Sequence, residues 1–222
     1  MQFVYHPNAG ENPLIVDTKE YAHLFKVRRV SIGDTLTWRN LEDDYLYEYT
    51  ITRIDKKESH LEQVAKQESR IVASKSLHIG WCVVDPKSIE KTLPMLNELG
   101  VEKISFVFSD FSQKQYKVDE ERLKRILINS SQQCGRSNLM RIEVLKNVKN
   151  YLELYPSSVI LDFSADVLTN ETSITSILIG PEGGFSAKER EMFLQKEVFG
   201  LDCPTILRSE TAVVVVTSKI IA

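Results

Sequence analysis

Cysteine is scarce in this sequence and is never paired at close spacing. The three cysteines, Cys82, Cys134 and Cys203, lie far apart, and no C-x-x-C motif is present. This pattern excludes a disulfide framework and indicates no zinc site, and the four histidines show no metal-ligand spacing either. We therefore expect a protein of a reducing compartment that holds no metal.

An excess of basic residues and long apolar runs are also missing. The 28 Lys and Arg residues face 31 Asp and Glu residues, which gives a net charge of -3 and a pI near 5.9. The molecule is thus no polycation, and any contact with nucleic acid must come from a local patch. The N-terminus lacks the features of a signal peptide, and the longest apolar runs are shorter than the roughly 18 residues of a membrane helix. We expect a soluble, cytoplasmic protein with no membrane contact.

The composition is that of a globular protein. Of 222 residues, 42% are hydrophobic and 27% are charged, with only nine glycines and seven prolines. At roughly 150 residues per domain the length gives about one and a half domains. One large domain or two small ones are the alternatives.

The first 70 residues have the pattern of a small β domain. Segments 34–39 and 45–54 carry Thr, Trp, Tyr and Ile at strand-like spacing around a polar turn, which predicts a hairpin. A helix is expected over 18–27, capped by Asp17 or Thr18. The polar stretch 66–76 lacks periodicity, and we place a domain boundary there, near residue 72.

The remainder of the chain alternates strands with helices, which is typical of an α/β domain with a parallel sheet. Gly100 and Gly135 are expected to end two of the helices, and Ser186 with Glu189 forms a capping box that begins a third. The expected strands cover 77–84, 104–108, 158–163 and 174–179, and the first two helices cover 86–99 and 119–134.

A glycine-bearing loop between a buried strand and the capped helix is the most informative segment. It reads Gly-Pro-Glu-Gly-Gly-Phe over 180–185 and matches neither a P-loop nor G-x-G-x-x-G. Glu182 would repel a phosphate but would tolerate a sulfonium or an amino group, which favours S-adenosylmethionine. The alternative, about equally probable for an isolated loop of this kind, is that these glycines only turn the chain.

Two further segments carry charged residues. Ile206 to Ala212 contains Arg208 and Glu210, which by themselves predict a structural ion pair at the start of a helix. Upstream, Gly135 and Arg136 end a helix, where a capping glycine and a cation suit the helix dipole.

Together, and in this order, these segments resemble a known family. Gln-x-Gly-Arg, G-P-E-G-G-F-S-x-x-E and I-L-R-x-E-T-A are similar to motifs of the RsmE family, SPOUT-superfamily methyltransferases that modify N3 of a uridine in small-subunit (16S) ribosomal RNA. The stretch 23–34 also resembles that family's N-terminal segment, and the resemblance covers the whole chain. Departures from the family's common residues occur at Gln2, Pro94-Met95, Gln132 and Cys203.

The resemblance implies a fold, a cofactor and an assembly. It implies a PUA-like RNA-binding β-barrel over 1–71 and a trefoil-knotted SPOUT methyltransferase domain over 72–222, working as a homodimer with S-adenosylmethionine. It also implies a helix over 210–222, although Val213 to Val216 by propensity alone predict a strand. That helix is either apolar enough to form a dimer face or part of the core. The residues expected at the cofactor are Leu161, Ile179, Gly180, Glu182, Gly183, Gly184, Leu201, Ile206 and Leu207.

The implied reaction assigns roles to a few charged residues. Methyl transfer from a sulfonium to a ring nitrogen needs three atoms nearly in line, so catalysis is chiefly positioning. Loss of the uracil N3 proton leaves an anion on two carbonyl oxygens, which Arg136 or Arg208 could stabilise, with Glu210 as the base. The target base must be unpaired or flipped out of a duplex. Lys26, Arg28 and Arg29 are the candidates for RNA contact.

Two other functions are compatible with the sequence. One is ribose 2'-O-methylation by a related SPOUT enzyme, in which a hydroxyl is the nucleophile. The other is an RNA-binding ribosome-assembly factor that has lost catalysis, which the departures from the family pattern would explain. The intact loop over 180–185 favours the enzyme.

Overall fold

The computed structural model describes residues 2–112, 115–170 and 173–221, so Met1 and Ala222, the ends of the two predicted domains, lie outside the described residues. The chain divides into two units, Met1–Val72 with Ile128–Leu139, and Ala73–Leu127 with Met140–Ala222. The first break falls beside the boundary that the sequence predicts near residue 72. The return of 128–139 to the first unit has no counterpart in the sequence pattern.

The first unit contains a five-stranded sheet in the order β1-β3-β4-β5-β2. The hairpin prediction is confirmed, because β3 and β4 pair antiparallel with Thr35 opposite Thr50. The pairing of β4 with β5 shifts register at two places, between Glu48 and Tyr49 and between Ile51 and Arg53. The strands are β1 (Val4–Tyr5), β2 (Leu14–Asp17), β3 (Thr35–Arg39), β4 (Tyr45–Ile54) and β5 (Glu58–Glu68).

Aromatic and aliphatic side chains fill the core of this sheet. Trp38, Tyr49, Leu24 and Leu61 are fully buried there. Gln132 joins residues 128–139 to the unit through two hydrogen bonds. Its backbone carbonyl accepts from Gln2 N at 2.7 Å, and its side-chain Oε1 accepts from Tyr5 N at 2.9 Å.

The helix expected over 18–27 is wrong in its extent and type. The structure has a π-helix, η1, over His23–Val27, after a turn in which Asp17 Oδ1 accepts hydrogen bonds from Lys19 N and Glu20 N. Asp17 therefore caps a turn and not an α-helix. Arg29 then adopts a positive φ of 57°, which ends the helical segment within a few residues.

The second unit is built on a six-stranded, wholly parallel sheet in the order β11-β9-β10-β6-β7-β8. Each strand that the sequence predicts after residue 76 is present, although most are shorter than expected. The structure adds β8 and β11, which the sequence pattern does not predict. The strands are β6 (His78–Cys82), β7 (Lys103–Val107), β8 (Arg141–Leu145), β9 (Val159–Leu161), β10 (Ser176–Ile179) and β11 (Val198–Phe199).

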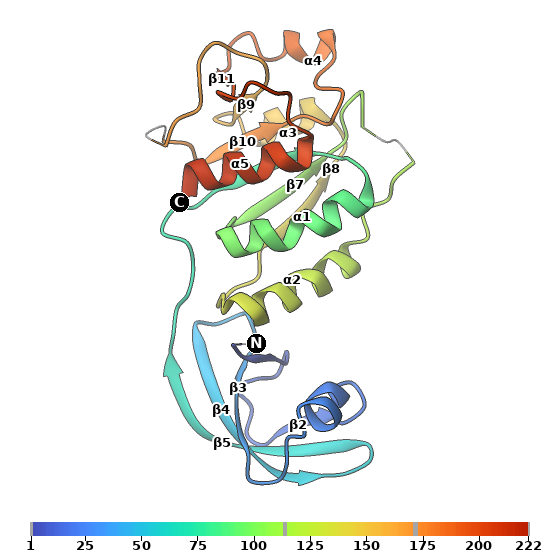
Figure 1. Cartoon of the computed structure of the whole chain (residues 1–222), viewed down its shortest axis with the longest axis vertical. Coiled ribbons are helices and arrows are strands. Elements are labelled where there is room, and N and C mark those ends of the chain that lie inside the picture. The colour runs from blue at the N-terminus through green and yellow to red at the C-terminus, as the bar shows by residue number, and fades with distance from the viewer. Residues whose placement is uncertain (1, 113–114, 171–172, 222) are drawn as a thin grey trace. The chain divides into compact units, whose positions relative to one another are not determined.

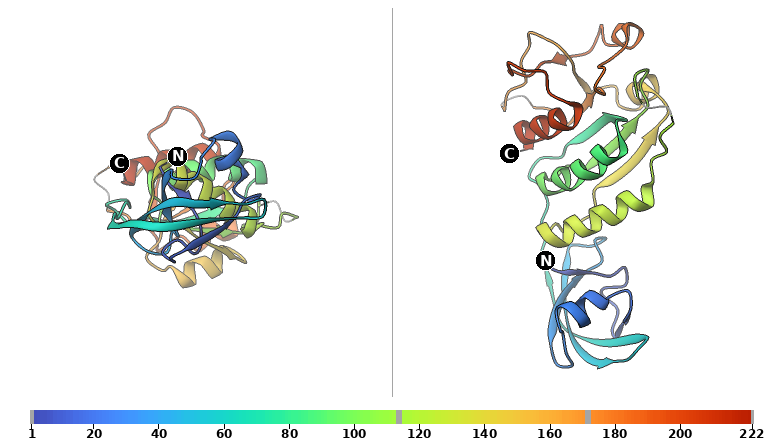
Figure 2. Two further views of the ribbon diagram at one scale, coloured as in Figure 1. Left: turned by 90° about the horizontal axis from the view of Figure 1, so that it is seen from below. Right: turned by 45° about the vertical axis from the view of Figure 1, so that its right-hand side comes forward.

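The helices that the sequence predicts over 86–99 and 119–134 are present, and both end at the expected glycines. Asp85 caps α1 (Pro86–Leu99) and Gly100 ends it with a φ of 96°, while Gly135 follows α2 (Glu120–Cys134) with a φ of 89°. Two shorter helices, α3 (Val148–Leu154) and α4 (Ala187–Glu191), follow along the chain. Figures 1 and 2 show α1 and α5 (Ser209–Ile221) side by side on one face of the parallel sheet, with α3 on the other face.

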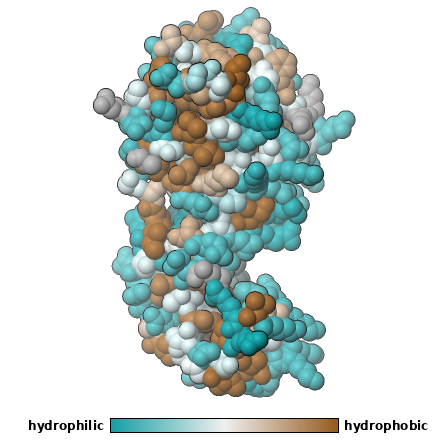
Figure 3. Space-filling view, viewed as in Figure 1, coloured by the Kyte–Doolittle hydropathy of each residue, from teal (hydrophilic) through white to brown (hydrophobic). Residues whose placement is uncertain are grey.

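The valine-rich C-terminal segment is helical, as the family resemblance implies and against its β propensity. Val213, Val216 and Ile220 recur at helical spacing and are fully buried, so one face of α5 belongs to the core. Burial of that face outweighs a local preference worth a fraction of a kcal/mol per residue (about 0.5). Val214, Val215 and Ile221 stay half-buried, and Figure 3 shows apolar residues gathered over this helix.

The described helices include none that could cross a membrane, because each is too short or too polar.

Candidate functional site

A pocket lies at the carboxyl ends of β9 and β10, wholly within the second unit. Ligands of open α/β sheets bind at this edge, where the loops that follow parallel strands meet. The cavity measures about 550 Å³, within the range of small-molecule and cofactor sites. Its walls are Leu161 to Ala165, Ile179 to Glu182, Gly184, Phe185, Gly200, Leu201, Cys203 to Leu207, Ser209 and Ala212.

The loop 180–185 forms one wall and holds a tight turn. Gly184 N donates to Pro181 O at 2.9 Å, and Gly184 has a φ of 68°, a conformation that L side chains rarely adopt. A Cβ at Gly180 would lie 3.1 Å from the Phe185 ring. The backbone conformation therefore favours glycine at Gly184, and a side chain at Gly180 would have to push the Phe185 ring aside by a few tenths of an ångström.

The capping box after the loop is confirmed, and it does more than begin α4. Ser186 Oγ accepts from Glu189 N at 3.2 Å, and Glu189 Oε2 accepts from Ser186 N at 2.9 Å. The second carboxylate oxygen of Glu189 accepts from Asp110 N at 2.9 Å. This buried carboxylate thus ties the loop after β10 to the loop after β7.

The opposite wall depends on a close approach between two backbone segments. Gly200 N donates to Asp166 O at 2.7 Å, and a Cβ at Gly200 would lie only 2.4 Å from Ser164 O. Only glycine fits without a backbone shift. Beside it, Asp162 accepts two hydrogen bonds from Arg190, at 2.7 and 3.0 Å, which brace the end of β9 against α4.

Cys203 occupies a wall position where the family commonly has glycine. The described non-glycine residues with positive φ are Arg29 and Leu41, so Cys203 does not need a glycine conformation. Its thiol lies 3.5 Å from Thr205 Oγ1, and hydrogen bonds with Thr205 hold the pKa of that thiol below its usual value. The departure is accommodated without backbone strain.

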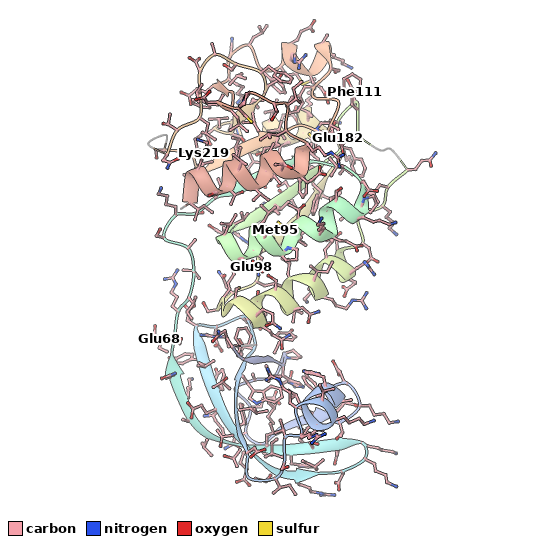
Figure 4. All side chains as sticks on the ribbon, viewed as in Figure 1. Glu68, Met95, Glu98, Phe111, Glu182 and Lys219 are labelled. Carbon is pink, nitrogen blue, oxygen red and sulfur yellow. The ribbon has the colours of Figure 1, made fainter. Side chains whose placement is uncertain are left out.

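Of the nine residues predicted at the cofactor, the structure brings eight together around this pocket. Gly183 is the exception, because it does not line the cavity. It lies against Phe111 instead, and a Cβ added at Gly183 would lie 3.3 Å from the Cβ of Phe111. Phe111 and Glu182 lie near each other at this edge of the unit (Figure 4). The eight are Leu161, Ile179, Gly180, Glu182, Gly184, Leu201, Ile206 and Leu207.

The three predicted catalytic residues differ in their surroundings. Arg208 follows the wall residue Leu207, is 82% exposed, and stands 3.9 Å from Glu210, too far for a strong ion pair. Glu210 is 22% exposed, and its Oε2 is buried without a hydrogen-bond partner among the described residues. Arg136 belongs to the first unit, where it is buried and its Nε donates to Asn138 Oδ1 at 2.8 Å.

The predicted RNA-binding residues Lys26, Arg28 and Arg29 are all exposed, in and just after η1 of the first unit. They lie close together in the sequence, with only Val27 between them, on a chain whose net charge is -3.

Several wall residues had no signal in the sequence. Phe163, Ser164 and Ala165 follow a strand that is shorter than its apolar pattern suggests, and Ala212 falls inside a helix. Ser209 occupies the variable position of the I-L-R-x-E-T-A motif. Only the expectation that loops after parallel strands gather at one edge could have pointed to the first three.

The comparisons with known proteins agree with this architecture. The model of an RNA methyltransferase domain matches residues 72–221, and that of an RNA methyltransferase PUA domain matches residues 16–64. Ribosomal RNA small subunit methyltransferase E of Helicobacter pylori is 43% identical over 222 residues, which cover 98% of each chain. The chain belongs to the RsmE family of RNA methyltransferases.

Solved structures of similar proteins share the fold. A ribosomal RNA small subunit methyltransferase E from Neisseria gonorrhoeae, bound to S-adenosyl methionine, superposes with a TM-score of 0.83 at 19% identity, over 98% of this chain and 95% of that one. A probable rRNA-methyltransferase from Porphyromonas gingivalis gives a TM-score of 0.87 at 22% identity, over 98% and 96%. The predicted combination of a PUA-like and a SPOUT-type domain is thereby confirmed, while the trefoil knot stays a prediction.

Proposed function

We propose that this protein transfers a methyl group from S-adenosylmethionine to N3 of a uridine in small-subunit ribosomal RNA. The pocket at the glycine loop carries the proposal, because eight residues predicted for that cofactor meet there. The relative from Helicobacter pylori, with 43% identity over nearly the whole chain, supports the ribosomal RNA substrate.

The residues of the pocket fit S-adenosylmethionine. Leu161, Ile179 and Leu207 supply apolar surface for an adenine ring, and the loop 180–184 supplies backbone polar groups. Glu182 places an exposed carboxylate at the wall, where it would attract the positive amino or sulfonium group. When bound, the sulfonium supplies the activated methyl group.

Glu210 and Arg208 are the residues that we assign to proton transfer and charge stabilisation. The unpartnered Oε2 of Glu210 takes the proton that leaves uracil N3, as the ring nitrogen forms its bond to the methyl carbon and the carbon–sulfur bond breaks. Arg208, exposed and only loosely paired, is free to approach the uracil oxygens as they become negative. Arg136 is the alternative cation.

RNA binding is assigned to the first unit and dimerisation to the second. Lys26, Arg28 and Arg29 would contact phosphates, while the base itself must leave any duplex to expose N3. The half-buried Val214, Val215 and Ile221 of α5 are the apolar surface that we assign to a homodimer.

Mapping the methyl group on the RNA product tests the function directly. Small subunits from a strain that lacks the gene, incubated with the protein and S-adenosylmethionine, should yield N3-methyluridine by mass spectrometry of nucleosides. A methyl group on a ribose 2'-oxygen would replace the proposal with the related SPOUT reaction. RNA binding without cofactor binding in calorimetry would identify an assembly factor.

A further inference from the structure

Ser209 lies buried at the point where helix α5 meets the glycine loop. It is 4% exposed, and its Oγ accepts a hydrogen bond from Trp81 Nε1 at 2.9 Å and donates one to Gly180 O at 2.6 Å. One hydroxyl therefore joins strand β6, the loop after β10 and the first turn of α5. Ser209 itself lines the pocket.

The bond to Gly180 holds a peptide that has no other hydrogen-bonding group. The next residue is Pro181, which has no N–H, so the carbonyl is the one polar group of the planar Gly180–Pro181 peptide. Its direction fixes the plane in which the loop leaves the sheet. The loop then turns through Gly184, whose N–H bonds back to Pro181.

The bond from Trp81 holds the hydroxyl in place. Trp81 is fully buried, and an indole N–H can only donate. Since this donor occupies an acceptor lone pair of Ser209, the hydroxyl proton points to Gly180. The orientation of the loop is thus set from the core of the sheet.

We infer that Ser209 is a positioning residue for the cofactor, whose hydroxyl holds the loop 180–184 in its binding shape before the ligand arrives. This inference rests on the proposed function. Without the hydroxyl, the Gly180 carbonyl can rotate away, and only a fraction of molecules keep a competent loop. The apparent dissociation constant then rises by the inverse of that fraction.

Ser158 offers a matched control for a structural effect alone. It is also a buried serine, 2% exposed, whose Oγ hydrogen-bonds an aromatic partner, Tyr151 OH, at 2.8 Å. It precedes β9, whereas the pocket lies at the other end of that strand, at Leu161. Ser158→Ala removes a comparable bond away from the loop.

The experiment measures S-adenosylmethionine binding by calorimetry with the full chain. Ser209→Ala should weaken binding about ten-fold, Ser209→Thr should restore it to within about two-fold, and Ser158→Ala should leave it unchanged. Both alanine variants should lower the melting temperature. In kinetics, Ser209→Ala should raise KM for the cofactor with little change in kcat at saturation.

Trp81 provides a spectroscopic signature of the same contact. The chain has two tryptophans, and Trp38 Nε1 has no hydrogen-bond partner among the described residues, so Trp38→Phe isolates Trp81 emission without loss of a hydrogen bond. In that background the cofactor should change the emission of Trp81, and Ser209→Ala should abolish this change.

Wild-type affinity in Ser209→Ala, combined with earlier melting, would overturn the inference and make Ser209 purely structural. If that variant does not fold, Ser209→Cys takes its place, because a thiol donates weakly, and equal affinity of the Cys and wild-type proteins has the same meaning. Absence of cofactor binding by the wild-type protein itself would refute the proposed function instead.

Discussion

The strongest pH effect on folding should come from His78, in a polar cluster at the amino ends of the parallel strands. Its Nδ1 lies 3.1 Å from Ser176 Oγ and its Nε2 lies 2.6 Å from Ser105 Oγ. The ring packs against Tyr155 and Tyr151, with centroids 4.2 and 5.7 Å away. A neutral imidazole suits these contacts, because one ring nitrogen donates while the other accepts.

Burial, and then the charge of Lys103, lowers the pKa of His78 from 6.5 to about 4, while nearby Glu143 opposes the shift. The folded state therefore binds this proton less readily than the unfolded state. Stability is full above pH 6.5 and is lost as the pH falls toward about 4. A pKa difference of this size between the folded and unfolded states corresponds to about 3 kcal/mol of folding stability. Because the ring is partly exposed to solvent, we expect acid to remove only about 1–2 kcal/mol of the free energy of unfolding.

The assay is urea unfolding at several pH values, read from Trp81 emission in the Trp38→Phe background so that the second unit is followed. His78→Gln should be less stable than the wild-type protein at neutral pH. Its free energy of unfolding should, however, fall less steeply between pH 6.5 and 4.5, because the variant lacks the imidazole that titrates there. Glu143 does not contribute to the change in stability between pH 6.5 and 4.5. Burial raises the pKa of Glu143, but hydrogen bonds from Ser105 and other groups outweigh burial and lower that pKa below 4.5, so Glu143 takes up its proton only at lower pH.

His6→Gln is the control, because burial also lowers the pKa of His6, but that residue lies in the first unit. In the His6→Gln variant, the stability of the second unit should depend on pH as it does in the wild-type protein. An equal slope in His78→Gln and wild type would refute the reasoning and assign the acid sensitivity to other groups.

Four further predictions concern the site and its partners. Gly200→Ala should destabilise the fold by about 1–3 kcal/mol in urea and weaken cofactor binding, because the new Cβ would meet a carbonyl oxygen at 2.4 Å; unchanged values would show that this wall yields easily. Arg208→Ala should lower turnover at saturating RNA without earlier melting, since its ion pair is long and exposed; early melting with full turnover would make it scaffolding. Replacing Lys26, Arg28 or Arg29 should instead weaken RNA binding and flatten its salt dependence by roughly one unit of slope per lost contact. Light scattering should give the mass of a homodimer, and a monomeric mass would contradict the proposed dimer.

The sequence by itself determined the features that depend on neighbouring residues. The capping box at Ser186 and Glu189, the glycine stops at Gly100 and Gly135, and the first hairpin all appear where the pattern predicts them. Such signals act over three or four residues, because a cap or a turn satisfies backbone groups close by in the chain. The glycine loop could be found for the same reason.

Tertiary structure decided what depends on residues distant in the chain. Val213 to Val216 form a helix because one face of α5 is buried in the core, and residues 128–139 join the first unit through contacts with its N-terminal strand. Gly200 and Ser209 showed no signal, since Gly200 approaches the backbone of Ser164, 36 residues before it, and Ser209 contacts the backbone of Gly180, 29 residues before it. The sequence can therefore predict individual loops of the pocket wall, whereas the contacts that hold those loops together form only in the folded chain.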